Sequence, residues 1–184
     1  MPGKKGHISE GELLIIAEKI KLLVLDVDGV LTDGSITLDA GENELKSFHV
    51  RDGHGIKMLM KAGINVALIT GRYSKVVERR GKELGIKEIF QKCRDKKTAY
   101  RQLADKYSLR DSEIAYMGDD IVDISVLKMC GLPVTVADAE DEVKSTVRMI
   151  TKRYGGRGAV REVCDFLLRA KGLWEGILHG YSET

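Results

Sequence analysis

The stretch LLVLDVDGVLTDG, residues 22–34, constrains the fold of this chain more than any other segment. An apolar run begins at Leu22 and leads directly to Asp26 and Asp28, and Asp33 follows. Such a run is typical of a strand that is buried on both faces of a parallel sheet. Two carboxylates at one strand end repel each other unless a positive group lies between them. The stretch therefore predicts a buried strand whose end holds a positive group.

Apolar runs alternate with helical patterns along almost the whole chain. Strands are predicted at 22–27, 65–70, 88–90, 113–119 and 133–138, with an edge strand at 148–151. Helices are predicted at 9–19, 55–62, 74–85, about 95–107, up to residue 130, 140–147 and 158–171. This alternation predicts an α/β fold with a doubly wound (Rossmann-like) parallel sheet and helices on both faces.

Two segments depart from the alternation. Residues 35–38 and 45–50 flank the turn-like DAGEN and predict a β-hairpin that leaves the main sheet. The tail at 173–184 has apolar residues at helical spacing, but two glycines interrupt it, so it is either frayed or docked on another surface. We expect one domain over 1–184, with its core at about 21–172.

Composition excludes several classes of partner. A net charge of +2 gives no support for binding to nucleic acid or to an anionic membrane. No apolar run approaches the roughly 20 residues that cross a bilayer, and the run at 13–17 is too short for a signal peptide. The three cysteines, Cys93, Cys130 and Cys164, lack metal-type spacing. We therefore expect a cytoplasmic protein with reduced thiols.

Chemically active side chains follow the predicted strands at their carboxyl ends, where open α/β sheets bind ligands. These residues are Asp26 and Asp28, then Thr70, Gly71 and Arg72, then Asp119, Asp120 and Asp123, with Lys96 at a nearby helix start. A hard divalent cation relieves the repulsion among the carboxylates, and Mg²⁺ is usual where phosphate also binds. Together with a lysine and a hydroxyl, the set predicts phosphoryl transfer.

The same residues resemble the motifs of the haloacid dehalogenase superfamily. DVDGV resembles its first motif, ITGR its second, Lys96 its third and GDDIVD its fourth. FHVRDGHGIK and GGRGAVREVCDFLL resemble the 3-deoxy-D-manno-octulosonate 8-phosphate (Kdo 8-phosphate) phosphatases of that superfamily, and the likeness runs over about 21–172. The resemblance implies hydrolysis of Kdo 8-phosphate during lipopolysaccharide biosynthesis.

The resemblance also implies catalytic roles. Asp26 would be the nucleophile that forms an aspartyl phosphate, and Asp28 would protonate the leaving alkoxide and then deprotonate water. Mg²⁺ would be held by the Asp26 carboxylate, the Asp28 backbone carbonyl and Asp119. Phosphoryl oxygens would be bound by Thr70 and Lys96. The metal waters and Lys96 would be oriented by Asp120 and Asp123.

A substrate pocket and an assembly are implied in the same way. The pocket residues would be Asp28, His49, Val50, Arg51, Asp52, Gly53, Lys57, Gly71, Arg72, Arg80 and Lys96, with Arg157 reaching a neighbouring active site. The basic side chains among them suit an anionic sugar acid. The family has no large cap domain, so the hairpin would stand in for one, and neighbouring subunits would close the sites in a homotetramer.

Three alternatives stay open. The chain has His49 and Lys57 where the family often carries Asn and Arg, so another sugar-acid phosphate, such as sialic acid 9-phosphate, is a candidate substrate. A phosphorelay receiver module uses similar residues, but its adjacent acidic pair follows the first strand, whereas here it follows the fourth. A catalytically inactive relative is the third alternative, although every expected catalytic side chain is present.

Overall fold

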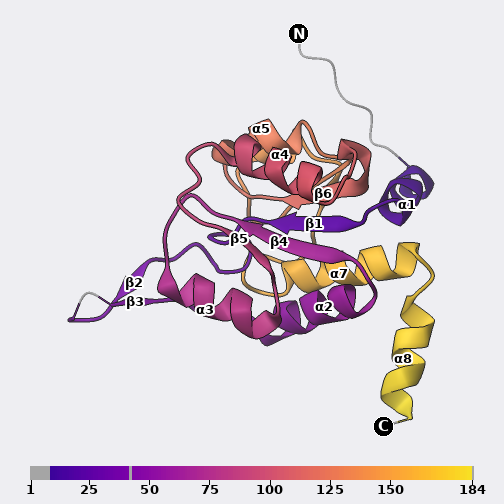
Figure 1. Cartoon of the computed structure of the whole chain (residues 1–184), viewed down its shortest axis with the longest axis horizontal. Helices are drawn as coiled ribbons and strands as arrows, with labels where there is room; N and C mark the ends of the chain where they lie inside the picture. Colours follow the sequence, from indigo (N-terminus) through magenta and orange to yellow (C-terminus); the bar gives the residue numbers. More distant parts are fainter. Residues whose placement is uncertain (1–8, 42, 184) are drawn as a thin grey trace.

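The computed structural model describes residues 9–41 and 43–183 and places a parallel sheet of six strands at their centre (Figure 1). The strands are β1 (Leu22–Leu25), β4 (Asn65–Ile69), β5 (Glu88–Phe90), β6 (Ile114–Met117), β7 (Leu132–Thr135) and β8 (Met149–Ile150). Their order is β5-β4-β1-β6-β7-β8, so the chain winds outwards from β1 in one direction and then in the other. This order is the doubly wound arrangement, and it confirms the predicted fold class.

Helices cover both faces of the sheet (Figure 1). One layer contains α2 (Val50–Lys61), α3 (Lys75–Leu84) and α7 (Ala159–Ala170), and the other contains α4 (Lys96–Lys106) and α5 (Ile124–Leu127). The shorter helices include α1 (Glu10–Glu18), which begins at a capping box formed by Ser9 and Glu12, and α6 (Asp141–Lys144). Because both faces are covered, every residue of β1 is buried. No helix in the described ranges combines the length and hydropathy needed to span a membrane.

A small antiparallel hairpin, which follows β1 and precedes α2 in the chain, projects from the body of the molecule (Figure 1). Its strands are β2 (Thr37–Leu38) and β3 (Glu44–Leu45). The predicted hairpin is present, but its second strand ends at Leu45 and not at residue 50, and α2 begins at Val50 instead of Gly55. The helix starts early because the His49 side chain accepts a hydrogen bond from the backbone N–H of Arg51.

The glycines of α2 explain why its first turn was missed. Gly53 and Gly55 lower the helix propensity of this segment. A Cβ at Gly53 would lie 2.4 Å from the Arg80 guanidinium, and one at Gly55 would lie 2.9 Å from Cδ of Arg161. The glycines therefore allow α2 to pack closely against α3 and α7, which is a tertiary requirement.

The C-terminal tail is helical over α8 (Trp174–Ser182), which extends away from the body (Figure 1). Trp174 is buried, and the Arg169 guanidinium lies 4.2 Å from its ring centroid. Leu178 and Tyr181 are exposed. The first turn of α8 is thus docked, and the last turn also contacts α2, where the Tyr181 hydroxyl lies 3.2 Å from Nε2 of His54.

Asp52 joins α2 to the start of α7. Its buried carboxylate accepts hydrogen bonds from the backbone N–H groups of Gly158, at 3.2 Å, and Arg161, at 2.7 Å. Gly158, at the N-cap of α7, has no side chain that could satisfy these donors. Asp52 therefore replaces the missing cap from a distant part of the sequence.

We expect Asp52→Ala to lower the free energy of unfolding by about 2 kcal/mol, because it leaves two buried N–H groups unpaired. Urea unfolding followed by circular dichroism measures this change. Asp105→Ala is the matched control, because Asp105 is exposed on α4, and its effect should stay within about 0.5 kcal/mol. Equal stability of the two variants would exclude the capping role.

Candidate active site

The ends of β1 and β6 form the centre of the site. Leu25 pairs with Met117 on one side and with Leu68 of β4 on the other, so these strands end level with one another. Asp26 follows β1 directly, and its backbone N–H donates to the carbonyl of Met117 at 2.9 Å. Winding changes direction between β1 and β6, which is where doubly wound sheets bind ligands.

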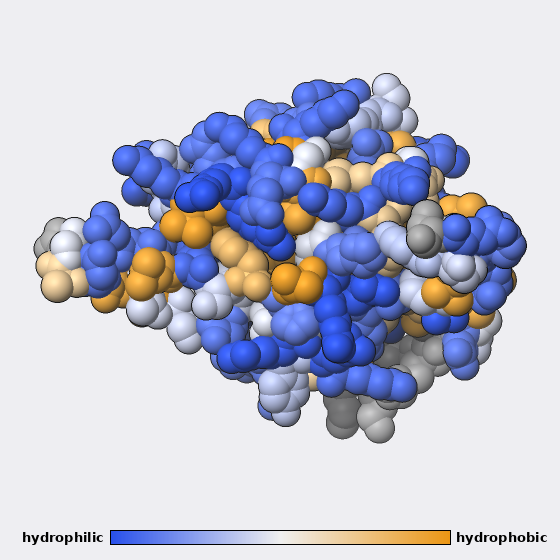
Figure 2. Space-filling model, turned by 90° about the horizontal axis from the view of Figure 1, so that it is seen from below, coloured by the Kyte–Doolittle hydropathy of each residue, from blue (hydrophilic) through white to orange (hydrophobic). Residues whose placement is uncertain are grey.

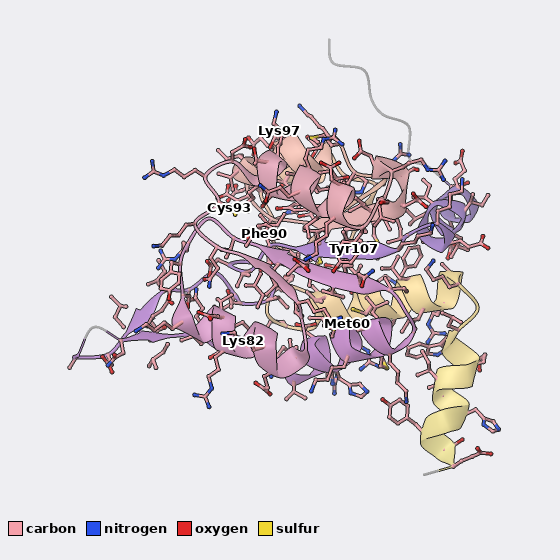
Figure 3. The ribbon with its side chains drawn as sticks, viewed as in Figure 1. Met60, Lys82, Phe90, Cys93, Lys97 and Tyr107 are labelled. Atoms are coloured by element: carbon pink, nitrogen blue, oxygen red, sulfur yellow. The ribbon has the colours of Figure 1, made fainter. Side chains whose placement is uncertain are left out.

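Lys96 lies between two of the carboxylates. Its Nζ is 2.9 Å from Oδ2 of Asp26 and 2.6 Å from Oδ1 of Asp123, and all three side chains are buried. Burial alone would lower the pKa of Lys96, but the charges of Asp26 and Asp123 outweigh it and raise that pKa above its ordinary value. Lys97, the next residue, points away from the sheet on the outer side of α4 (Figure 3). The structure thus brings the predicted lysine, and not its neighbour, to the site.

Asp123 is saturated with hydrogen bonds. Its Oδ1 accepts from Lys96 and from the Tyr116 hydroxyl, each at 2.6 Å. Its Oδ2 accepts from the backbone N–H groups of Asp119, at 3.2 Å, and Asp120, at 3.3 Å. Asp123 therefore fixes both the lysine and the loop that follows β6. The side chain of Asp120 is exposed and accepts from the backbone N–H of Ile121.

Asp119, unlike Asp123, has a carboxylate oxygen without a hydrogen bond. Its Oδ1 is buried and has no hydrogen-bond partner, whereas every other buried side-chain nitrogen or oxygen of the described residues has one. Burial and the charges of Asp26 and Asp123 raise the pKa of Asp119 to about 8. Burial and the charge of Asp123 likewise raise the pKa of Asp26 to about 7, against the opposing effect of Lys96. One ammonium does not compensate these acids, so the site favours a further cation.

The donor set fits a hard divalent cation such as Mg²⁺. Asp26, Asp119 and Asp123 each place one carboxylate oxygen within 4.8 Å of the others. Because Asp123 already accepts four hydrogen bonds, Asp26 and Asp119 have the oxygens available for a metal. Carboxylate oxygens are the ligands that Mg²⁺ prefers in proteins. The buried, unpaired Oδ1 of Asp119 is therefore an oxygen that a metal ion could bind.

Thr70 directly follows β4, the strand next to β1 in the sheet. It is buried, its backbone N–H donates to the carbonyl of Phe90, and its carbonyl accepts from Cys93 in the loop after β5 (Figure 3). Its Oγ1 accepts a weak 3.4 Å hydrogen bond from the backbone N–H of Arg72. The hydroxyl proton is therefore available to an anion. Gly71 and Arg72, which follow, are exposed.

Asp28 is half-buried and is held from the hairpin. One of its oxygens is contacted by the ammonium of Lys46, and Nε of Arg72 lies 3.9 Å from the other. Glu44 joins the group, with Oε1 at 3.4 Å from Lys46 Nζ and 3.2 Å from Arg72 Nη2. Lys46 was missed by sequence reasoning, because a lysine in a predicted hairpin has the pattern of a solvated side chain.

The other predicted pocket residues divide into two groups. His49, Asp52, Gly53 and Arg80 line one small pocket together with Phe48, over whose ring the Arg80 guanidinium lies at 5.8 Å. The carboxylate of Asp52 is occupied by α7, as described above. The structure does not bring the second group into that pocket: Val50, Arg51 and Lys57 are exposed on α2, and Arg157 lies 3.5 Å from Asp33 in the loop after β1.

Comparisons with known proteins agree with this geometry. Residues 84–162 match the sequence profile of haloacid dehalogenase-like hydrolases. The chain is 46% identical to the 3-deoxy-D-manno-octulosonate 8-phosphate phosphatase KdsC of Escherichia coli strain K12 over 161 residues, which is 88% of this chain and 86% of that protein.

Solved structures show the same likeness. The crystal structure of the 3-deoxy-D-manno-octulosonate 8-phosphate phosphatase from Yersinia pestis matches with a TM-score of 0.89 and 44% identity, over 90% of this chain and 89% of that chain. The phosphatase of that name from Moraxella catarrhalis, solved in complex with a magnesium ion, a phosphate ion and a KDO molecule, matches with a TM-score of 0.92 and 39% identity, over 94% and 99%. The chain therefore belongs to the 3-deoxy-D-manno-octulosonate 8-phosphate phosphatase family of haloacid dehalogenase-like hydrolases.

Proposed function

We propose that this protein is a magnesium-dependent phosphatase that hydrolyses Kdo 8-phosphate to Kdo and inorganic phosphate in lipopolysaccharide biosynthesis. The observation that carries the proposal is the buried, unpartnered Oδ1 of Asp119 beside Asp26 and Lys96. A metal and a phosphate supply the charge and the hydrogen-bond donors that this cluster lacks. The Moraxella catarrhalis relative binds a magnesium ion, a phosphate ion and KDO, which supports the same ligands here.

Asp26 attacks phosphorus in line and forms an aspartyl phosphate, as the phosphorus–oxygen bond to the sugar breaks. Asp28 gives its proton to the leaving sugar oxygen, and its carboxylate then takes a proton from the water that cleaves the aspartyl phosphate. The phosphoryl oxygens are bound by the Thr70 hydroxyl and the Lys96 ammonium. The carboxylates of Asp26 and Asp119 and the backbone carbonyl of Asp28 would hold Mg²⁺, which would supply positive charge to offset the charge on the phosphoryl oxygens.

The remaining residues position these groups or bind the sugar acid. Asp123 holds Lys96 through a 2.6 Å hydrogen bond, and Asp120 lies beside it in the same loop. We assign recognition of the sugar acid to His49, Val50, Arg51, Asp52, Gly53, Lys57, Gly71, Arg72 and Arg80, and to Arg157 of a neighbouring subunit. Within one chain, only His49, Asp52, Gly53 and Arg80 of this set line the small pocket described above. The basic members of this set attract the substrate's carboxylate.

The whole chain acts as one phosphatase domain, in the cytoplasm, as a homotetramer. The hairpin supports the assembly, because Ile36, Leu38 and Leu45 expose more than half of their surface there. Hydrophobic, orange surface is visible on the projecting part of the molecule at the left of Figure 2. Exposed apolar side chains gathered on a projecting element indicate a protein contact.

We expect Asp26→Asn to lower phosphate release by at least about 1,000-fold, because an amide cannot act as the nucleophile. The fold should persist, since Asn has the same shape, and circular dichroism checks this. Asp105→Asn, on the exposed face of α4, is the control and should keep the wild-type rate. Wild-type activity in Asp26→Asn would refute the nucleophile assignment.

The substrate is tested by phosphate release with and without Mg²⁺ from Kdo 8-phosphate, sialic acid 9-phosphate and simple hexose phosphates. We expect Kdo 8-phosphate to be preferred by at least about 100-fold in kcat/KM, and a chelator to abolish release from it. Magnesium-dependent preference for another sugar acid would keep the mechanism and change the substrate. Absence of release from every ester would refute the function.

The assembly is tested by substituting Leu38 with Lys on the exposed hairpin. The charge should disrupt a tetramer contact, so light scattering should give a tetramer mass for the wild type and a smaller mass for Leu38→Lys. Ile15→Lys, at a similarly exposed site on α1, is the control and should remain tetrameric. A monomeric wild type would refute the tetramer.

A further inference from the structure

Lys46 is buried although it lies in an exposed hairpin. Its side chain is 1% exposed, whereas the side chain of Leu45, the preceding residue, points outwards. Lysine is almost never fully buried unless its ammonium is paired. The hairpin has no core that would require a long side chain at this position. The burial of Lys46 therefore reflects its ionic partners.

Those partners are Asp28 and Glu44. The Lys46 ammonium contacts Oδ1 of Asp28 and lies 3.4 Å from Oε1 of Glu44, which in turn lies 3.2 Å from Nη2 of Arg72. Partial burial works to raise the pKa of Glu44, but a hydrogen bond from Ser74 and the charge of Lys46 outweigh it and lower that pKa. Glu44 is thus an ion that pairs with Lys46 in addition to Asp28.

The two carboxylate oxygens of Asp28 have different contacts. Oδ1 is bound by Lys46, whereas Oδ2 makes no hydrogen bond with any described residue and has Nε of Arg72 at 3.9 Å. The Asp28 side chain keeps 24% of its surface exposed. One oxygen is therefore anchored, and the other is available at the site.

We propose that Lys46 is a positioning residue that fixes the carboxylate of Asp28 for proton transfer to the leaving oxygen of the substrate. The inference rests on the proposed function, in which Asp28 is the general acid and base. The torsion that orients a carboxylate has broad minima, so an unanchored Asp28 samples many orientations. Proton transfer requires one oxygen at hydrogen-bond distance from the reacting group, and the contact with Lys46 selects that orientation.

The test compares two phosphate esters in the first turnover, with Mg²⁺ present. Kdo 8-phosphate releases an alkoxide that must gain a proton, whereas p-nitrophenyl phosphate releases a phenolate that leaves without one. We expect Lys46→Met to slow release of the Kdo product by about 100-fold and release of p-nitrophenol by less than about 5-fold. KM for Kdo 8-phosphate should change by less than about 3-fold, because Lys46 acts through Asp28.

Two further variants sharpen the test. Lys46→Arg keeps a cation at the same place and should recover at least about tenfold of the lost rate on Kdo 8-phosphate. Glu44→Gln leaves Lys46 with one charged partner and should give a smaller loss with the same selectivity between the esters. Lys82→Met is the matched control, because Lys82 points into solvent from α3 (Figure 3) and should keep both rates.

Each other result overturns the proposal. Equal losses on the two esters indicate a general structural or electrostatic role, a raised KM with unchanged kcat indicates direct substrate binding, and unchanged rates exclude any role. If Lys46→Met fails to fold by circular dichroism, the ratio of the two rates in Glu44→Gln and Lys46→Arg decides. If the wild type cleaves another alkyl phosphate but not Kdo 8-phosphate, the proposed function fails and the same comparison with that ester still tests Lys46.

Discussion

The buried ammonium of Lys96 is the interaction on which the site depends. It supplies one positive charge to a cluster of three carboxylates, and its Nζ lies closer to Asp123 than to Asp26. Asp123 also accepts hydrogen bonds from Tyr116 and from two backbone N–H groups. Asp26 and Asp119 are buried near other carboxylates with too little positive charge to balance them, so the pKa of each is raised. Carboxylates in that condition either take up protons or bind a cation. A site that requires Asp26 as an ionised nucleophile needs the cation.

Two glycines allow the backbone to approach these carboxylates closely. A Cβ at Gly29 would lie 1.9 Å from Oδ2 of Asp119, and one at Gly118 would lie 2.4 Å from the Asp123 carboxylate carbon. Gly29 also has a φ of +85°, which L side chains rarely adopt. The loop after β1 can therefore approach the loop after β6 closely enough for acids from both strands to share one ligand. The same sequence position in DVDGV thus serves both the turn and the chemistry.

The sequence predicted those parts of the molecule that local pattern and chemical motif determine. Buried strands, the helix starts near Ser9, Ser74 and Asp95, and the convergence of Asp26, Asp119 and Lys96 all follow from short segments read alone. Lys46, the early start of α2 and the helical tail did not follow. Their placement depends on a partner that is distant in sequence, such as Asp28 for Lys46, and the propensities of the local residues favour other structures.

The proposed assembly and the proposed chemistry would both involve the hairpin, because its side chains alternate between two faces. Leu45 is directed outwards beside the other exposed apolar residues, whereas Glu44 and Lys46, on either side of it, turn towards Asp28 and Arg72. A strand of this kind cannot change its outer face without moving its inner face, because successive side chains lie on opposite sides. Contact of the outer face with a neighbouring subunit would restrain the small two-stranded sheet, which has little packing of its own. The orientation of Asp28 would then depend on assembly as well as on the fold of one chain.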